Sequence, residues 1–274
     1  PINFTVVFSK SVTGFTGADV KLTGTAGATT AVVTGSGATY NVAVSGMAGS
    51  GTVIAAVLAG GAQDASGNSN AASTSIDNTV LYDITLPTVT INQAVGQIDP
   101  TNVSPINFTG VFNEPVTGLM NTDVALSGTA GATTVVLTGS GTTYNVAVSG
   151  MTGSGTVIAT IPAGNAQDAA GNSNANSTST DNTVTYDATA LTVTINQAAA
   201  QADPTNVSPI DFTVVFSKSV TGFATGDVTL SGTAGATTAV VTGSGTTYNV
   251  EVSGMTGSGT VIATILAGVA TDVS

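Results

Sequence analysis

The sequence contains no cysteine, no histidine and no tryptophan. Without cysteine, disulfide bonds and thiolate metal sites are excluded. Without histidine as well, the chain lacks the side chains that most often act as general base, nucleophile or zinc ligand near neutral pH. A hydrolase that used carboxylates alone would need two of them in one cleft, whereas the acids here fall in expected end loops. We therefore expect a protein that is not an enzyme.

Positive charge is also scarce, because Lys10, Lys21 and Lys218 are the only basic residues against 15 acidic ones, giving a net charge of −12. Such a surface repels nucleic acid, which we exclude as a partner. No apolar run reaches the roughly 18 residues that a membrane helix needs, so we expect no membrane insertion. Charged residues make up only 7% of the chain, and 34 glycines accompany abundant Thr, Ser, Ala and Val. This composition is typical of a β-rich protein with a nearly neutral surface.

One long stretch occurs three times, beginning at Ala28, Ala132 and Ala236, with a spacing of 104 residues. Residues Ala31–Asp64 and Ala239–Asp272 are identical at 27 of 34 positions. A period of about 100 residues indicates a whole-domain repeat. The predicted domains are residues 1–84, 85–188 and 189–274, of which the first lacks its first strand and the third lacks its last. We expect the chain to be a window from a longer array.

Within the middle repeat, apolar and polar residues alternate in short segments, the pattern of half-buried strands. The seven predicted strands are Thr88–Ala94, Pro105–Phe112, Asp123–Ser127, Thr133–Thr138, Thr142–Ser149, Thr156–Ile161 and Asp181–Tyr186. The second is the most apolar and is expected to be central. The prediction is an all-β chain of tandem immunoglobulin-like, seven-strand antiparallel sandwiches. A β-solenoid is the alternative fold, but its short internal period is not visible.

Four segments of the middle repeat resemble a known family. They are Leu86–Ile91 (LPTVTI), Asp99–Asn102 (DPTN), Pro115–Gly118 (PVTG) and Asp168–Asn172 (DAAGN). Together they resemble the bacterial Ig-like repeats of large surface adhesins and biofilm-associated proteins. The resemblance implies an extracellular or cell-surface location and a role as extender modules that hold a binding domain away from the cell. It also implies calcium at the domain junctions.

Calcium takes six to eight oxygen ligands, so oxygen-bearing side chains in the loops at each junction are the candidate ligands. The residues expected at the first junction are Asp83, Glu114, Asp168 and Asn172, and those expected at the second are Asp99, Asn102 and Asp187, facing Lys218 and Asp272. Lys218 stands where the middle repeat has Glu114, and lysine cannot ligate a metal. The second junction is therefore the weaker calcium candidate, with Lys218 pairing with Asp187 or Asp99. The alternative is that these Asp and Asn residues only form turns.

Two functions follow as expectations. The first is a structural extender, or stalk, in a bacterial adhesin, whose partners are the neighbouring repeats of the same chain. The second is a repeating subunit of an extracellular filament, sheath or surface layer, in which identical chains assemble by strand exchange. A sugar- or ice-binding module is a third, weaker interpretation, because aromatic residues make up only 5% of the chain.

Overall fold

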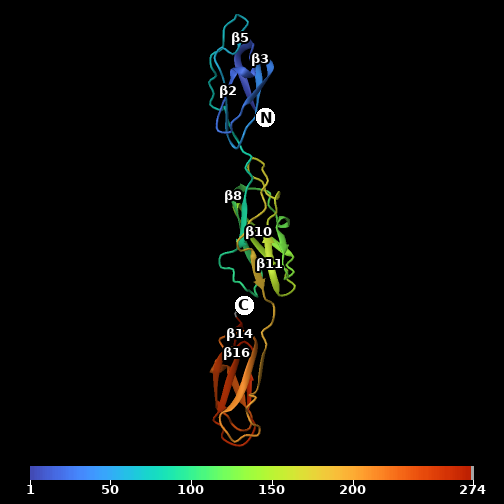
Figure 1. Ribbon diagram of the computed structural model, residues 1–274, viewed down its shortest axis with the longest axis vertical. Coiled ribbons are helices and arrows are strands. Elements are labelled where there is room, and N and C mark those ends of the chain that lie inside the picture. Colours follow the sequence, from blue (N-terminus) through green and yellow to red (C-terminus); the bar gives the residue numbers. More distant parts are fainter. Residues whose placement is uncertain (273–274) are drawn as a thin grey trace.

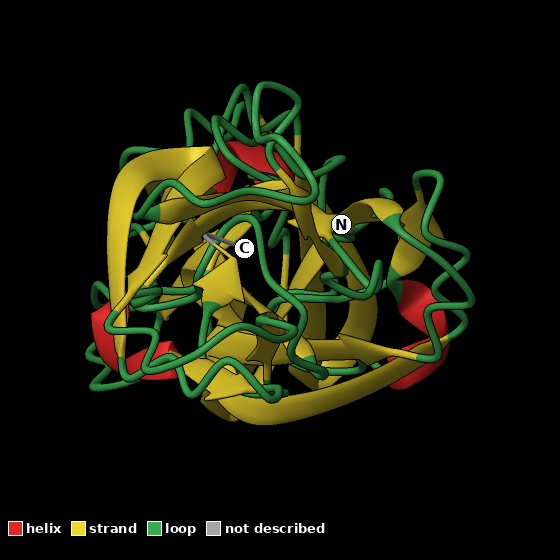
Figure 2. Ribbon diagram, turned by 90° about the horizontal axis from the view of Figure 1, so that it is seen from below, coloured by secondary structure: helices red, strands yellow, loops and turns green. Residues whose placement is uncertain are grey.

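The structure, a computed structural model, describes residues 1–272. The chain forms three elongated units in a row along one axis, in sequence order (Figure 1). Viewed along that axis, the short helices lie at the periphery on different sides of the molecule (Figure 2). Because each repeat contributes one of these helices, successive repeats are rotated relative to one another about the axis.

Each repeat contains strands and one short 3₁₀ helix. In repeat 1 these are β1 (Ile2–Thr13), η1 (Gly17–Asp19), β2 (Val20–Thr23), β3 (Thr30–Ser45), β4 (Gly51–Val57), β5 (Gln63–Asp64) and β6 (Thr79–Tyr82). In repeat 2 they are β7 (Val89–Gln93), β8 (Ile106–Val116), η2 (Asn121–Asp123), β9 (Ala125–Ser127), β10 (Thr134–Ser149), β11 (Gly155–Thr160) and β12 (Thr183–Tyr186). In repeat 3 they are β13 (Val193–Gln197), β14 (Ile210–Thr221), η3 (Thr225–Asp227), β15 (Val228–Ser231), β16 (Thr238–Ser253), β17 (Ile262–Ile265) and β18 (Thr271–Asp272).

The strands of each repeat form two small antiparallel sheets. In repeat 2 the sheet orders are β10-β8-β7 and β12-β11-β9, so the most apolar strand, β8, is central as predicted. Repeat 1 has the orders β3-β1-β5 and β2-β4-β6. Repeat 3 has β13-β14-β16, with β18 also paired to β14, and a two-stranded sheet of β15 and β17. The expectation of an all-β chain built from antiparallel sheets is confirmed.

Three separate hydrophobic clusters lie along the chain, and each draws its residues from one repeat. In repeat 2 the cluster joins Ile106 and Phe108 of β8 to Val157 of β11 and Val184 of β12, all fully buried. Since β8 belongs to one sheet and β11 and β12 to the other, the apolar faces of the two sheets pack against each other. The alternation of apolar and polar residues in the sequence therefore marks the inward face correctly.

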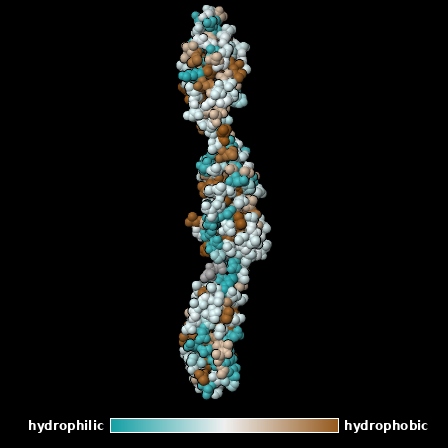
Figure 3. Space-filling model, viewed as in Figure 1, coloured by the Kyte–Doolittle hydropathy of each residue, from teal (hydrophilic) through white to brown (hydrophobic). Residues whose placement is uncertain are grey.

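The surface is correspondingly low in charge. On the face shown in Figure 3, brown hydrophobic residues occur in small separate groups among white and teal ones. Thr, Ser, Gly and Ala supply much of the nearly neutral surface, as the 7% of charged residues implies. In the part of the chain that the structure describes, no helix has the length and apolar character to cross a membrane.

The segment from Thr134 to Ser149 is a single strand element, whereas the sequence predicts two strands separated at Gly139–Gly141. The chain nevertheless reverses within β10, because the Thr133 N–H donates to the Ser149 carbonyl at 3.1 Å. A straight strand of this length would hold those ends roughly 50 Å apart. Gly139 and Gly141 have φ values of 106° and 68°, which glycine adopts without steric cost. The two predicted strands therefore correspond to the two arms of β10, and strand conformation continues through the reversal between them.

A second difference concerns the strand predicted to begin at Asp123. Residues Asn121–Asp123 form the 3₁₀ helix η2, and β9 starts only at Ala125. The Asp123 carboxylate accepts a hydrogen bond from the Met120 N–H at 2.7 Å, while the Asp123 N–H donates to the Met120 carbonyl at 3.0 Å. These two bonds close a turn, in which the Asp123 side chain reaches back to the residue before the helix, as in a capping box.

The same core position is buried to different degrees in repeats 1 and 2. Phe108 is fully buried, whereas Phe4, one repeat earlier, is only partly buried. The strand β8 has β7 on one side and β10 on the other, while β1 pairs with β3 and, near its end, with the two-residue β5. The strand that covers this part of the core in repeat 2 therefore has no counterpart beside β1 in the described residues.

We predict that Phe108→Ala destabilises repeat 2 by about 3–5 kcal/mol, because a fully buried ring is replaced by a cavity. Phe4→Ala serves as the matched variant and is expected to cost repeat 1 distinctly less. Native-state hydrogen exchange at amides of β8 and β1 would measure both losses, repeat by repeat. Equal losses in the two repeats would contradict the difference in burial.

Candidate functional site

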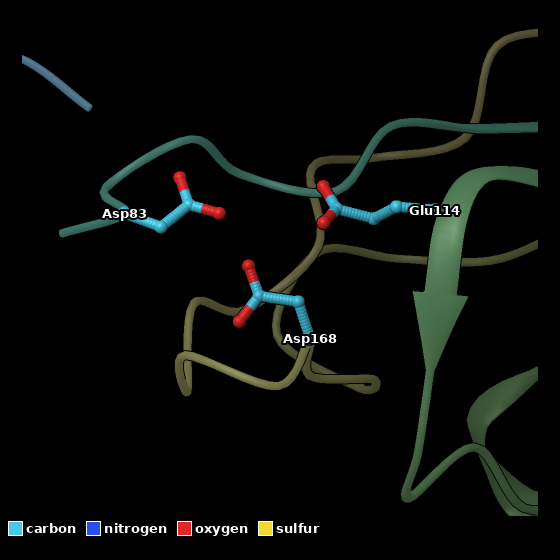
Figure 4. A group of neighbouring side chains, drawn as sticks. All are labelled: Asp83, Glu114 and Asp168. Carbon is cyan, nitrogen blue, oxygen red and sulfur yellow. The ribbon is translucent and has the colours of Figure 1, made fainter. Parts of the chain in front are cut away.

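Three carboxylates converge where repeat 1 meets repeat 2. Asp83 follows the end of β6, Glu114 lies on β8, and Asp168 belongs to the loop after β11. One carboxylate oxygen from each lies within 4.8 Å of the other two. Their carboxylates point toward a common space between the chain segments (Figure 4). These are three of the four residues expected at the first junction, brought together from two repeats.

Asp83 is positioned by its own segment. One of its carboxylate oxygens accepts hydrogen bonds from the Thr85 N–H and the Ser50 hydroxyl, both at 2.9 Å. Ser50 also accepts a bond from the Ile84 N–H at 3.0 Å. These bonds, the Thr85 N–H first and then the Ser50 hydroxyl, hold the pKa of Asp83 below its ordinary value. The group is therefore ionised at neutral pH.

Asp168 is the most buried of the three, with 7% of its surface exposed. Its Oδ1 accepts from the backbone N–H groups of Ala170 and Asn172, and its Oδ2 accepts from the Asn172 side-chain amide. Burial raises the pKa of Asp168, but the hydrogen bonds from Asn172 and Ala170 outweigh it and leave the pKa lowered. The loop thus keeps a buried carboxylate charged, and it does so partly as a turn, as the alternative interpretation expected.

Asn172 also crosses the junction. Its side-chain amide donates to the backbone carbonyl of Asp83 at 3.2 Å. The fourth residue expected at the first junction therefore contacts the preceding repeat directly, as well as holding Asp168.

The charge of this group has no protein counter-ion in residues 1–272. The ion pairs there involve Lys10 and Lys218, and none reaches Asp83, Glu114 or Asp168. Three close carboxylates repel one another, and partial burial strengthens the repulsion because the local dielectric constant is below that of water. Carboxylate oxygens at this separation are suited to a hard cation such as calcium.

The second junction is arranged differently. The Lys218 ammonium donates to Asp187 Oδ2 at 2.6 Å, to Asp272 Oδ2 at 2.9 Å and to the Thr189 carbonyl at 2.7 Å. Hydrogen bonds to Asp187 and then Asp272 raise the pKa of Lys218, so the ammonium remains charged. The predicted contact between Lys218 and Asp187 is present.

The two remaining candidate residues of the second junction, Asp99 and Asn102, differ in their surroundings. Asp99 accepts a hydrogen bond from the Thr185 N–H at 2.9 Å, within repeat 2, and so acts as a loop acceptor for β12. Asn102 lines a cleft between repeats 2 and 3 together with Asp187 and Asp272. At the second junction, the structure therefore places Asn102 near Asp187 and uses Asp99 for local structure.

The residues that support the junction aspartates were not among those predicted from the sequence. Ser50 and Thr85 support Asp83, and Ser154 and Thr189 support Asp187 with the same hydrogen bonds. Each pair is related by the 104-residue spacing. That repetition was the available signal, but serine and threonine are so frequent in this chain that it did not stand out.

Comparison with protein families, with curated proteins and with solved structures finds no match.

The counterpart of Asp168 in repeat 1 gives a pH prediction. The side chain and backbone N–H of Asn68 donate to Asp64 and, with the Ser66 N–H and Lys10, lower its pKa to about 2. Because the folded pKa is lowered, the stabilisation is present above the ordinary value of 3.8 and is lost as pH falls toward about 2.

An NMR titration of the Asp64 side-chain carboxyl would measure this pKa directly. Lys10→Gln is the control and should leave the pKa low, because Lys10 is the smallest of its causes. Titration of Asp64 near 3.8 would show that the loop does not hold the carboxylate as described.

Proposed function

We propose that this chain is a structural extender segment of a bacterial extracellular or cell-surface adhesin, in which length and stiffness are the function. The observation that carries the proposal is the row of three units along one axis (Figure 1). Each unit has its own core, and only the short segments 83–88 and 187–192 connect the flanking strands. Stacking of this kind converts chain length into reach.

The proposal includes an immunoglobulin-like sandwich for each repeat. Two antiparallel sheets enclose one core in repeat 2, and β10 reverses within itself, so that its two arms bring the strand segments to seven. Sheets of three or four short strands packed face to face are typical of that class.

Calcium bound at the first junction would stiffen the connection between repeats 1 and 2. Connected domains move relative to each other by default unless the interface is large. Asp83 comes from repeat 1, while Glu114 and Asp168 come from repeat 2, so one ion held by all three would join the repeats. Carboxylates from both sides supply the negative charge and oxygen ligands that calcium requires.

We predict that millimolar calcium raises the unfolding midpoint of repeat 2 by roughly 10–20 °C and that a chelator reverses the rise. A calcium concentration a hundredfold above the Kd stabilises the folded state by about 2.7 kcal/mol. Each kcal/mol raises the unfolding midpoint of a small domain by roughly 4–8 °C. Differential scanning calorimetry of the whole chain would record the change.

Glu114→Gln should remove most of the calcium response, because it takes one charge from the group. Glu251→Gln is the matched control, since Glu251 lies on β16 away from both junctions. No calcium response in the unchanged protein would refute calcium binding and leave these aspartates as turn residues.

A second candidate function has its own observation. In repeat 2, β7 lies along β8, and its backbone also bonds the segment at Thr178 through the Ile91 N–H and the Val89 carbonyl. In repeat 1 the corresponding surface is a groove, lined by β1 residues such as Phe4 and Val6 and by the segment around Thr74. A β7 strand from a second copy would fit this groove, and repetition of that exchange would build a filament.

This alternative predicts that a synthetic peptide of residues 86–97 binds repeat 1. The apolar Val89 and Ile91 side chains should cover Phe4, and the backbone should pair with β1. Chemical-shift changes confined to β1 and residues 71–78 would report binding, and light scattering at rising protein concentration would report chain assembly. A peptide with both Val89→Asp and Ile91→Asp is the control, and equal binding of both peptides would exclude strand addition.

A further inference from the structure

The two junctions are built from equivalent positions. A shift of 104 residues relates Asp83 to Asp187, Thr85 to Thr189, Glu114 to Lys218 and Asp168 to Asp272. The supporting bonds repeat as well. At both junctions the aspartate accepts hydrogen bonds from a serine hydroxyl and a threonine N–H. The residue directly after the aspartate donates its N–H to the same serine hydroxyl. The structures of the two linkers can therefore be compared atom by atom.

At the second junction this arrangement holds a cation, the Lys218 ammonium. The Lys218 ammonium is held by three oxygens, those of Asp187, Asp272 and the Thr189 carbonyl, at 2.6–2.9 Å. The Lys218 side chain is only 21% exposed, as is that of Asp187. A positive charge thus sits between the repeats, in contact with groups from both.

Repeat 1 supplies a second example of a lysine at this position. Lys10, one repeat before Glu114, contacts Asp64, one repeat before Asp168, at 3.4 Å. The Lys10 side chain is 70% exposed. A lysine at this strand position therefore reaches the loop aspartate even where few other groups surround it.

At the first junction the same place is surrounded by negative charge alone. Glu114 stands where the lysine would be, so three carboxylates face one another there instead of two carboxylates and an ammonium. The formal charge of the group is thus −3 rather than −1, a difference that a divalent cation offsets.

We propose that both junctions contain one and the same cation-binding position, filled by the Lys218 ammonium at the second and by a free divalent metal ion at the first. This inference rests on the proposed function for its biological meaning. It also assigns a further ligand, because the Thr85 carbonyl is the counterpart of the Thr189 carbonyl that Lys218 bonds. The metal's protein ligands are then Asp83, Thr85, Glu114 and Asp168.

The consequence is a chain with two unlike joints. The first joint is rigid only when the metal is present, whereas the second carries its own cation and is rigid without metal. An array that mixes glutamate and lysine at this position would have conditional hinges at defined places.

Reciprocal substitutions test the proposal. Glu114→Lys should give the first joint a built-in cation, and Lys218→Glu should make the second joint depend on metal. Lys21→Glu is the matched control for the second change, since Lys21 is exposed on β2, away from both joints. Because the chain has no cysteine, spin labels can be attached at introduced cysteines. Val32, Val136 and Val240 are suitable positions, being exposed and equivalent in the three repeats.

Pulsed electron paramagnetic resonance would measure the label distances between residues 32 and 136 for the first joint, and between 136 and 240 for the second. In the unchanged chain, calcium should narrow the distribution of distances between residues 32 and 136. The distribution between residues 136 and 240 should be narrow both with calcium and with chelator. Glu114→Lys should narrow the first distribution in chelator. Lys218→Glu should broaden the second in chelator, narrow it again with calcium, and raise the calcium stoichiometry from one to two by titration calorimetry.

Failure of the two proposals can be told apart. If the unchanged chain binds no calcium but Glu114→Lys still narrows the first distribution, metal binding is refuted and the shared cation position stands. If calcium binds the unchanged chain but Glu114→Lys leaves the first joint broad, the shared position is refuted. A Lys218→Glu chain that stays narrow in chelator would also refute it.

Discussion

The burial of alternating side chains between two small sheets determines where the junction groups lie. Phe108 and Ile106 anchor one end of β8 in the core, and Val116 anchors the other. Glu114 is therefore held on the same strand, two residues before Val116, at the end of the sandwich that meets repeat 1. The carboxylate cluster needs no rigid loop of its own, because a buried strand supplies Glu114 and a hydrogen-bonded turn supplies Asp168.

The junctions then show how one charged position changes the character of a contact while the backbone stays the same. The two linkers make the same serine and threonine hydrogen bonds. Glutamate or lysine at one strand position decides whether the charge between repeats is left unbalanced or compensated within the chain. The charge at a joint can therefore change without a change in the hydrophobic core, which is formed separately within each repeat.

Much of this was accessible from the sequence, since the 104-residue spacing aligns strands, loops and junctions at once. The central place of β8 followed from its apolar residues, and the convergence of Asp83, Glu114 and Asp168 followed from which loops share an end of a sandwich. The glycines at the reversal predicted a boundary between two strands, because glycine weakens a strand, whereas the structure carries strand conformation through the bend. Asp99 was predicted at the second site but accepts a hydrogen bond from Thr185 within repeat 2. The sequence alone does not distinguish a carboxylate that binds a metal from one that accepts a local N–H.

The way the chain passes through repeat 2 has a mechanical consequence. The chain enters through β7 and leaves through β12, and these strands lie in different sheets. The segments also make parallel bridges, Thr90 with Thr178 and Thr101 with Tyr186. Tension along the row would slide these segments past each other, so that their hydrogen bonds bear the load together rather than opening one after another. Such a repeat resists a pull along its axis far better than a pull across it.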